Sequence, residues 1–489
     1  MSIRVGPMVG VGVKEARIWF EAAPDEEYAV EVHAAGEQWR TRSVRSDGNG
    51  LALARFDDLE ANTCYTYTVK DDSGNDVANV PDCRFTTLPN PGDEIDLTFG
   101  FYSCHRPFYG DREKFEPESL KMWSEFDRQV NLGSMDDTRP QNIRFLLGVG
   151  DQVYTDRLWG KHSKKPRRRY RNLSDEELVE EYSKVYRKYL ELPEVRNACA
   201  HCPVFFTWDD HEIRDGWGSH GDEQNDDKPE KSALMDKFFR AASTAYNRYQ
   251  LSHNPHVDPA RGYYSFVYGK VGFIVLDLRR YRCLYKRELL GEAQKSWLEA
   301  ELATMTGRCE VVFVVCSVPY IHLTNQLTKL TGKWFVNTIL RFTGIRDDFI
   351  DQWNSEHCFA DAMWLGERLF NLVNEKGTRF VLLGGDVHVA TVAVLRSYLQ
   401  EHEYHPLIYQ FTSSAISNEP TTMARWLKRF ASEIELRKFF PFKGRLLKII
   451  PERNFGLVEV RKHPQTGDWG ITLSIHGEKS GVQRFPTVW

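Results

Sequence analysis

The stretch IRFLLGVGDQVY (143–154) decides the fold, because a continuous apolar run is followed at once by a glycine and an acid. A run of this kind is typical of a strand that is buried on both faces of a sheet. Similar runs occur at 96–103, 203–208, 273–278, 311–318, 379–385 and 406–414. Helical segments separate several of them, and one begins with a capping box formed by Ser174 and Glu177. This alternation predicts an α/β fold around a largely buried sheet.

The first 90 residues have a different pattern. LALARFDDL (51–59) and TCYTYTVKD (63–71) alternate apolar and polar residues, and turn-rich segments such as SDGNG (46–50) interrupt the alternation. We therefore expect a small antiparallel β-sandwich domain over residues 1–90. The segment PNPGDE, which begins at Pro89, is typical of a linker, so a second domain is expected over 96–489. Within it, residues 454–478 predict a closing hairpin.

Composition sets broad limits on the class of protein. The chain has 489 residues, 41% hydrophobic and 27% charged, with a formal net charge of −5, so it has no global basic field for nucleic acid. Its nine scattered cysteines indicate reduced thiols, and Cys199 and Cys202 are interpreted as ordinary thiols. The sequence shows no signal peptide and no long apolar run, so a cytoplasmic location is expected.

Chemically active side chains follow four of the predicted strands. The carboxyl ends of strands in an open α/β sheet border the crevice where ligands bind. The residues concerned are Cys104 after the first run, Asp151 and Tyr154 after the second, Asp209, Asp210 and His211 after the third, and Asp386 and His388 after the 379–385 run. The pattern therefore predicts that these side chains converge on one pocket.

Several carboxylates in one pocket repel each other unless a cation neutralises them. Asp151, Asp210, Asp386 and His388 supply oxygen and imidazole ligands for one or two metal ions. Tyr154 and Cys104 favour a transition metal such as iron over magnesium alone, because a phenol binds only beside a strongly acidifying ion. Such ions would neutralise a phosphate group and activate a water molecule for attack on it.

At these residues the sequence resembles a known family. The resemblance covers nearly the whole chain, and its motifs occur in the order GDQVY (150–154), TWDDHEIRDGW (207–217), LDLRRYR (276–282), LLGEAQKSWL (289–298), SVP (317–319) and GGDVH (384–388). Together they resemble the PhoD-like alkaline phosphatases of the calcineurin-like metallophosphoesterase superfamily. The resemblance implies an αββα sandwich preceded by a small antiparallel β-sandwich of immunoglobulin or fibronectin-III type. It also implies a phosphate monoesterase or diesterase with Fe3+ and Ca2+, for which Mn2+, Zn2+ or Mg2+ are alternatives.

The resemblance also assigns roles to residues. It makes Cys104, Asp151, Tyr154, Asp386, His388 and Asp210 metal ligands, and His211 a general acid that contacts phosphate. Relatives often have Asn where this chain has Asp215, which leaves open whether Asp209, Asp210 or Asp215 binds the second ion. For Asp209 we favour a supporting role, capping the next turn or orienting His211. Arg106 is either a phosphate clamp or part of a surface salt bridge.

Other charged segments have weaker interpretations. Asp277, Arg279 and Arg282 are expected to form an ion pair that braces the site. The basic run KHSKKPRRRYRN (161–172) is interpreted as a lid that attracts polyanionic substrates. Segments 327–342 and 424–450 mix basic and apolar residues and are expected to be core-facing helices, with peripheral membrane contact as the alternative.

The functional hypothesis is hydrolysis of phosphate esters, on small molecules or on larger phosphodiesters. A phospholipase-D-like phosphodiesterase is the alternative within the enzymes, and a non-catalytic, metal-stabilised binding protein is the alternative outside them. No specific nucleic-acid partner is expected. The sequence leaves the oligomeric state open.

Overall fold

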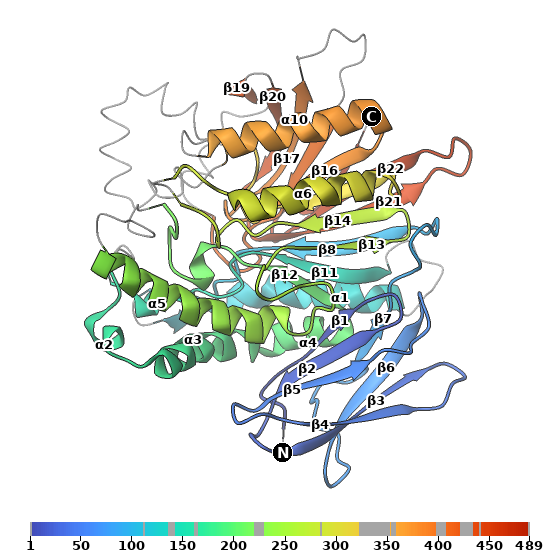
Figure 1. Ribbon diagram of the computed structural model, residues 1–489. Helices are drawn as coiled ribbons and strands as arrows, with labels where there is room; N and C mark the ends of the chain where they lie inside the picture. The colour runs from blue at the N-terminus through green and yellow to red at the C-terminus, as the bar shows by residue number, and fades with distance from the viewer. Residues whose placement is uncertain are drawn as a thin grey trace.

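The structure is a computed structural model of the chain. It describes residues 2–110, 113–134, 142–160, 165–219, 229–283, 286–321, 353, 358–397, 407–420, 434–439 and 442–487. Figure 1 shows these residues as layers of helices and sheets, with the amino-terminal strands at one end. The segment 327–342 and residues 161–164 of the basic run lie outside the described residues.

The amino-terminal strands form two small antiparallel sheets. The three-stranded sheet has the order β1 (Val5–Val11), β2 (Ala16–Glu21), β5 (Leu51–Phe56). The four-stranded sheet has the order β4 (Arg40–Arg45), β3 (Glu27–Ala34), β6 (Cys64–Asp71), β7 (Arg84–Thr86). The predicted alternation is confirmed in β3, where every second residue is buried. The immunoglobulin or fibronectin-III type and the domain boundary stay predictions.

The first large sheet has six strands. Its order is β12 (Val204–Thr207), β11 (Ile143–Val149), β8 (Leu97–Tyr102), β21 (Asn454–Lys462), β22 (Trp469–Gly477), β23 (Gly481–Pro486). The three apolar strands β8, β11 and β12 are parallel, as buried runs predict. Strands β21 and β22 pair antiparallel, so the predicted closing hairpin is confirmed.

The second large sheet has eight strands. Its order is β13 (Tyr264–Tyr268), β14 (Val271–Val275), β15 (Val311–Val315), β16 (Arg379–Gly384), β18 (Leu407–Thr412), β17 (Ala390–Ser397), β20 (Phe442–Ile450), β19 (Ile434–Phe439). Strands β14, β15, β16 and β18 are parallel. The short strands β9 (Phe108–Tyr109) and β10 (Lys114–Phe115) form a separate pair.

The helical interpretation of 424–450 is wrong where the structure describes this segment. Residues 434–439 and 442–450 form the edge strands β19 and β20. In β20 the basic residues Lys443 and Arg445 are exposed and alternate with buried Phe442 and Leu446. A period of two places basic side chains on one face of a strand, whereas the mixed composition alone does not distinguish it from a helix.

Helices cover the outer faces of the two large sheets. They are α1 (Lys121–Ser134), α2 (Arg168–Arg171), α3 (Asp175–Leu190), α4 (Pro193–His201), α5 (Pro229–Tyr246), α6 (Gly291–Thr306) and α10 (Phe359–Lys376). Single turns occur at η1 (Pro117–Leu120), η2 (Asp156–Leu158), η4 (Asp210–Glu212) and the π-turn η5 (Asn247–Leu251). The predicted capping box of Ser174 and Glu177 is present at the start of α3. None of the helices that the structure describes is long and apolar enough to cross a membrane.

The layers are joined by aromatic side chains. Phe99 of β8 contacts Phe273 of β14 and Phe313 of β15, with ring centroids 5.2 and 5.1 Å apart, so the two large sheets face each other. Helices α6 and α10 lie over the outer face of the eight-stranded sheet, and α1 covers the six-stranded sheet, where Phe126 stacks on Phe455 (Figure 1). The predicted α/β class is confirmed, with two facing mixed sheets.

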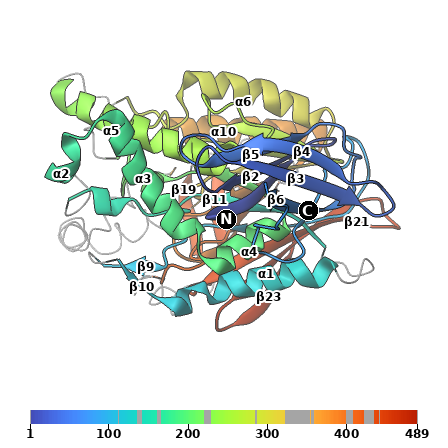
Figure 2. The same cartoon turned by 90° about the horizontal axis from the view of Figure 1, so that it is seen from below.

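The amino-terminal sheets pack against the α/β layers. Strand β1 lies against α4, and the views from the side and from below agree on this arrangement (Figure 1, Figure 2). The Arg187 guanidinium of α3 pairs with the Glu21 carboxylate of β2 at 2.6 Å. The hydroxyl of Tyr249 donates to the same carboxylate at 2.7 Å. A buried ion pair therefore fixes the first 90 residues to the rest of the molecule.

Candidate metal centre

The side chains that follow the central strands meet in one place. Three overlapping groups have ligand atoms that all lie within 4.8 Å of one another: Cys104, Asp151 and His388; Asp151, Asp210 and His211; and Asp151, Asp209, Asp210 and Asp386. Asp151 belongs to every group. Both large sheets contribute, because β8, β11 and β12 belong to one and β16 to the other. The structure thus brings together six of the nine predicted site residues, and Asp209 with them.

Glycines allow the strand ends to approach each other this closely. A Cβ at Gly150 would lie 2.6 Å from the Cβ of Asp209, and one at Gly385 would lie 2.4 Å from the carbonyl oxygen of Val149. The glycine before each of Asp151 and Asp386 is therefore required by packing. The next residues are strained, because Asp151 and Asp386 have φ of 57° and 61°. Cys104 and His388 both have φ of 55°, and such left-handed non-glycine residues cluster at functional sites.

Cys104 is completely buried beside Asp151. Its Sγ lies 3.4 Å from Asp151 Oδ2 and 3.1 Å from the Ser414 hydroxyl, which donates to it. Burial, together with the charge of Asp386, raises the pKa of the thiol to about 12. Without a cation the sulfur therefore keeps its proton, and a metal ion would be needed to make it a thiolate ligand.

A hydrogen-bond chain links Tyr154 to His388. The Tyr154 hydroxyl donates to Asp151 Oδ2 at 3.3 Å. The buried Asn418 amide donates to the Tyr154 oxygen at 3.3 Å and to His388 Nε2 at 3.0 Å. Burial lowers the pKa of His388 to about 3, so its ring is neutral and able to bind a metal. Sequence reasoning missed Asn418, which lies in the loop after β18, farther from the end of its strand than Asp151 is from the end of β11.

Arg279 holds the two carboxylates that follow β12. Its Nε donates to Asp209 Oδ1 at 2.5 Å, and its Nη2 lies 3.6 Å from Asp210 Oδ1. The Ser317 hydroxyl also donates to Asp209 Oδ1 at 2.7 Å. Asp277 pairs with Arg280 at 3.2 Å and also accepts a hydrogen bond from the backbone N–H of Arg279 at 3.0 Å. The Arg279 side chain therefore braces the site through Asp209.

His211 is oriented by Asp156, not by Asp209 as one prediction had it. The Nδ1 of His211 lies 2.9 Å from Asp156 Oδ2. Burial lowers the pKa of His211, but the carboxylates of Asp156 and Asp210 outweigh burial and raise it to about 10. Burial correspondingly raises the pKa of Asp156, but His211 and Arg106 lower it to about 2. The pair is therefore an imidazolium and a carboxylate. In the sequence, Asp156 was indicated only by its position at the end of GDQVYTD (150–156), two residues after Tyr154.

The remaining predicted residues lie around this pair. The Arg106 guanidinium lies over the Tyr154 ring, 5.0 Å from its centroid, and close enough to Asp156 to lower its pKa. Asp215 is only half-buried and lies outside the three groups of ligand atoms. Its backbone N–H donates to Asp156 Oδ1 at 3.2 Å. The structure thus places Arg106 and Tyr154 at the centre, and Asp215 at its edge.

Glu212 is a brace that sequence reasoning did not identify. Its buried carboxylate accepts hydrogen bonds from the backbone N–H groups of Asp151, Gln152 and Asp209, at 2.7–3.0 Å. Burial raises its pKa to about 7. By binding the loops after β11 and β12 at once, Glu212 fixes the distance between Asp151 and Asp209.

The ligand set fits bound cations. Asp209 Oδ2 and Asp210 Oδ1 are buried without a hydrogen bond, although Arg279 Nη2 lies 3.6 Å from Asp210 Oδ1. Burial, followed by the charges of Cys104, Asp210 and Asp209, raises the pKa of Asp151 well above its usual range. Buried carboxylate oxygens without partners are costly unless a cation compensates them. Oxygen, imidazole and sulfur donors together suit a transition metal next to a harder ion.

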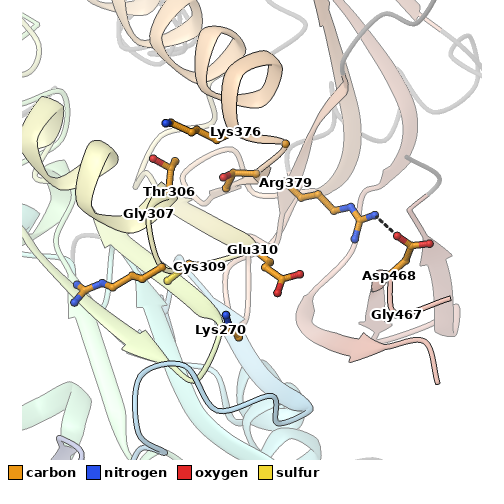
Figure 3. Close-up of a pocket in the computed structure, with 12 residues that line it drawn as sticks. Lys270, Thr306, Gly307, Cys309, Glu310, Lys376, Arg379, Gly467 and Asp468 are labelled. Carbon is orange, nitrogen blue, oxygen red and sulfur yellow. Dashed lines mark hydrogen bonds and ion pairs between the residues drawn. The ribbon is translucent and has the colours of Figure 1, made fainter. Parts of the chain in front are cut away.

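A separate surface hollow lies elsewhere. It has a volume of about 360 Å³, and none of the predicted site residues lines it. Figure 3 shows Lys270, Lys376 and Arg379 around it, with Arg379 paired to Asp468. It lies where α6 and α10 end and where β15 and β16 begin, so it is at the opposite strand ends from Asp151 and Asp386.

Two facing mixed sheets thus carry a cluster of possible metal ligands at their strand ends. Residues 124–464 match the model of the PhoD-like phosphatase family, and residues 1–89 match a domain family of unknown function, DUF7800. The chain belongs to the PhoD-like phosphatase family. The resemblance stated from the motifs is therefore confirmed.

Known relatives are distant. The chain is 24% identical over 417 residues to alkaline phosphatase D of Bacillus subtilis. This match covers 78% of this chain and 60% of that protein. The chain is 22% identical over 334 residues to an uncharacterized protein of Saccharomyces cerevisiae, covering 53% of this chain and 46% of that protein. The chain thus spans about half to three fifths of the length of these relatives.

Solved structures share the fold. The structure of PhoD superposes with a TM-score of 0.67 at 17% identity, covering 100% of this chain and 93% of that one. The purple acid phosphatase PPD1 from yellow lupin (Lupinus luteus) seeds superposes with a TM-score of 0.56 at 12% identity, covering 98% and 73%.

Proposed function

We propose that this protein is a metal-dependent hydrolase of phosphate esters. The observation that carries the proposal is that a half-buried imidazolium–carboxylate pair, His211 and Asp156, lies against a buried carboxylate cluster. A structural metal site needs only the carboxylate cluster. The pair supplies a proton donor beside the ions, which hydrolysis of an ester requires and structural support does not.

We propose two neighbouring ion sites. Cys104, Asp151, Tyr154, Asp386 and His388 would hold one ion, and Asp210 with the shared Asp151 would hold the other. Iron with calcium is the proposed pair, because sulfur and phenol donors favour a transition metal and carboxylates suit a hard cation. Asp209 is a further candidate for the second ion, since its Oδ2 is unpartnered while Oδ1 is held by Arg279. When bound, the ions would neutralise the phosphoryl group and acidify a water molecule.

The chain's own residues would bind the substrate and move the proton. Arg106, at the same centre, would bind phosphoryl oxygens through its planar guanidinium. His211 would protonate the leaving oxygen through Nε2, because Asp156 occupies Nδ1 and keeps the ring charged. Glu212 would hold the loop after β11 and the loop after β12 at a fixed distance during the reaction. Natural substrates would be phosphate monoesters, phosphodiesters or both.

The test is an assay of metal-reconstituted protein with a chromogenic monoester and its matching diester. We expect turnover that chelation abolishes and metal addition restores, and the ratio of the two rates identifies the preferred ester class. Asp151→Asn should lose most of the activity and bound metal, because Asp151 belongs to every ligand group. Asp72→Asn, in an exposed turn, is the matched control and should change neither. Full activity after exhaustive chelation would contradict the proposal.

A further inference from the structure

A second cavity lies between the amino-terminal sheets and the α/β layers. It has a volume of about 570 Å³. Its walls come from β6 and β7 on one side and from β11 and the end of α4 on the other, including Arg84, Arg144, Cys64 and Asn62. The volume falls within the range of small-molecule sites, which occur preferentially at domain interfaces.

Within the described part of the chain, the charged side chains that line this cavity are all positive. Among the described residues that line it there are two arginines and no aspartate or glutamate. Asn62, Thr86 and Asn142 add neutral hydrogen-bond donors. The hollow of Figure 3 is different, because Glu310 and Asp468 line it and Arg379 already pairs with Asp468.

Both guanidinium side chains belong to residues that line the cavity. Arg84 is held in place, because its Nη2 donates to Asn131 Oδ1 at 2.5 Å. Arg144 has no ion-pair or hydrogen-bond partner in the described part of the chain. His201 is unavailable to a ligand, since its ring nitrogens contact Asp127 and the Pro81 carbonyl.

We infer that this interdomain cavity binds the phosphoryl group of a small phosphorylated molecule, at a site separate from the metal centre. Two guanidinium groups in one cavity match phosphate oxygens, and amide and hydroxyl donors complete such a site. The volume leaves room for an organic group beside the phosphoryl group. The inference does not depend on the proposed hydrolysis, because the cavity shares no residue with the metal centre.

Cys64 provides a local reporter. It lines the cavity and is exposed, whereas the other eight cysteines are buried. The rate at which a neutral alkylating reagent modifies Cys64 can be measured on the full-length, metal-loaded protein by mass spectrometry. The ligands are phenylphosphonate, which phosphatases cannot hydrolyse, and inorganic phosphate, with chloride at equal ionic strength as the screening control. A Cys64→Ser variant establishes the background.

We expect phenylphosphonate to slow alkylation of Cys64 saturably, and chloride to leave the rate unchanged. Arg144→Gln should weaken that protection by about tenfold or more, the usual effect of losing a charge-assisted contact. Because Arg144 makes no native pair, this variant should fold normally, and Arg45→Gln on the exposed edge strand β4 should retain full protection. Stronger protection by phenylphosphonate than by inorganic phosphate would show that the cavity prefers a phosphoryl group attached to an organic group. Equal protection by the two would show that it binds the inorganic phosphate ion as well. No saturable protection, or equal protection in the wild type and Arg144→Gln, would overturn the inference.

Discussion

The pair of His211 and Asp156 tells most about the reaction that the metal centre could catalyse. A buried imidazole ordinarily loses its proton, because burial penalises the charged form. The 2.9 Å contact with Asp156 reverses that preference and raises the pKa of His211 to about 10. The ring is therefore charged at neutral pH, as a proton donor must be. The Tyr154 ring packs against it at a tilt of 34°, with centroids 4.0 Å apart.

His211→Asn should lower turnover of an alkyl phosphate by about a hundredfold or more, the usual contribution of general acid catalysis. A nitrophenyl phosphate, whose leaving group needs little protonation, should lose much less. The measurement is kcat for both esters in the wild type and the variant, with metal content as the control. A uniform loss for both esters would show that His211 acts in binding instead.

Asp156→Asn should move the alkaline limb of the pH–rate profile to lower pH. Asp156 raises the pKa of His211, so its removal lowers that pKa and the ring loses its proton at a lower pH. A nearby opposite charge typically changes a pKa by about one to three units. The profile for an alkyl phosphate is the measurement, and an unchanged alkaline limb would exclude Asp156 from this role.

Removal of the metal should make stability depend on pH. Burial raises the pKa of Asp151 well above its usual range and that of Glu212 to about 7. A carboxyl group whose folded-state pKa is raised contributes stability that is lost as the pH rises through that pKa. The melting temperature of chelated protein should therefore fall as the pH rises from about 4.5, the ordinary pKa of a glutamate, to about 7, the raised pKa of Glu212. Metal-loaded protein should melt at a nearly constant temperature, and Asp151→Asn should weaken the dependence in chelated protein.

Helix α3 shows how one element supports the centre from outside it. Its capping box satisfies backbone N–H groups that would otherwise lack partners, with Glu177 N–H donating to the Ser174 hydroxyl at 3.1 Å. Its buried Tyr182 then donates to the carbonyl of Ile213, in the loop that follows His211. Helix α3 therefore helps to position the loop that carries the proton donor His211.

Ser174→Ala should destabilise the protein by about 1 kcal/mol, the usual cost of losing an N-terminal cap. Urea unfolding gives the free energy of unfolding. Ser43→Ala, in the exposed strand β4, is the matched control and should leave that energy unchanged. Equal stability of Ser174→Ala and the wild type would mean that tertiary packing alone fixes the start of α3.

The whole molecule depends on the contact between its amino-terminal sheets and its α/β layers. Glu21 is almost fully buried between Arg187 and Tyr249. The Tyr67 hydroxyl of β6 also donates to the Ala200 carbonyl at the end of α4. These contacts hold the two parts together around the interdomain cavity, so the cavity's shape depends on the same interface.

Glu21→Gln should destabilise the protein by about 2 kcal/mol, because it removes the buried partner of Arg187 Nε and leaves Arg187 paired only with the more exposed Glu180. Arg4→Gln is the control, since Arg4 approaches the same carboxylate at 3.9 Å from an exposed position and should contribute less than about 1 kcal/mol. Urea unfolding with limited proteolysis measures both effects. A similar loss in the two variants would contradict a special role for the Glu21–Arg187 pair.

The sequence by itself determined the strands and the residues at their ends. Cys104, Asp151, Asp210 and Asp386 could be placed together because apolar runs of strand length end directly before them, and parallel strands share an edge. Tertiary structure decided which side chains complete the centre. Asn418 reaches Tyr154 across 264 positions, and Arg279 reaches Asp209 across 70. Such partners come from loops, where no period relates spacing in the chain to proximity in space, so only the folded molecule identifies them.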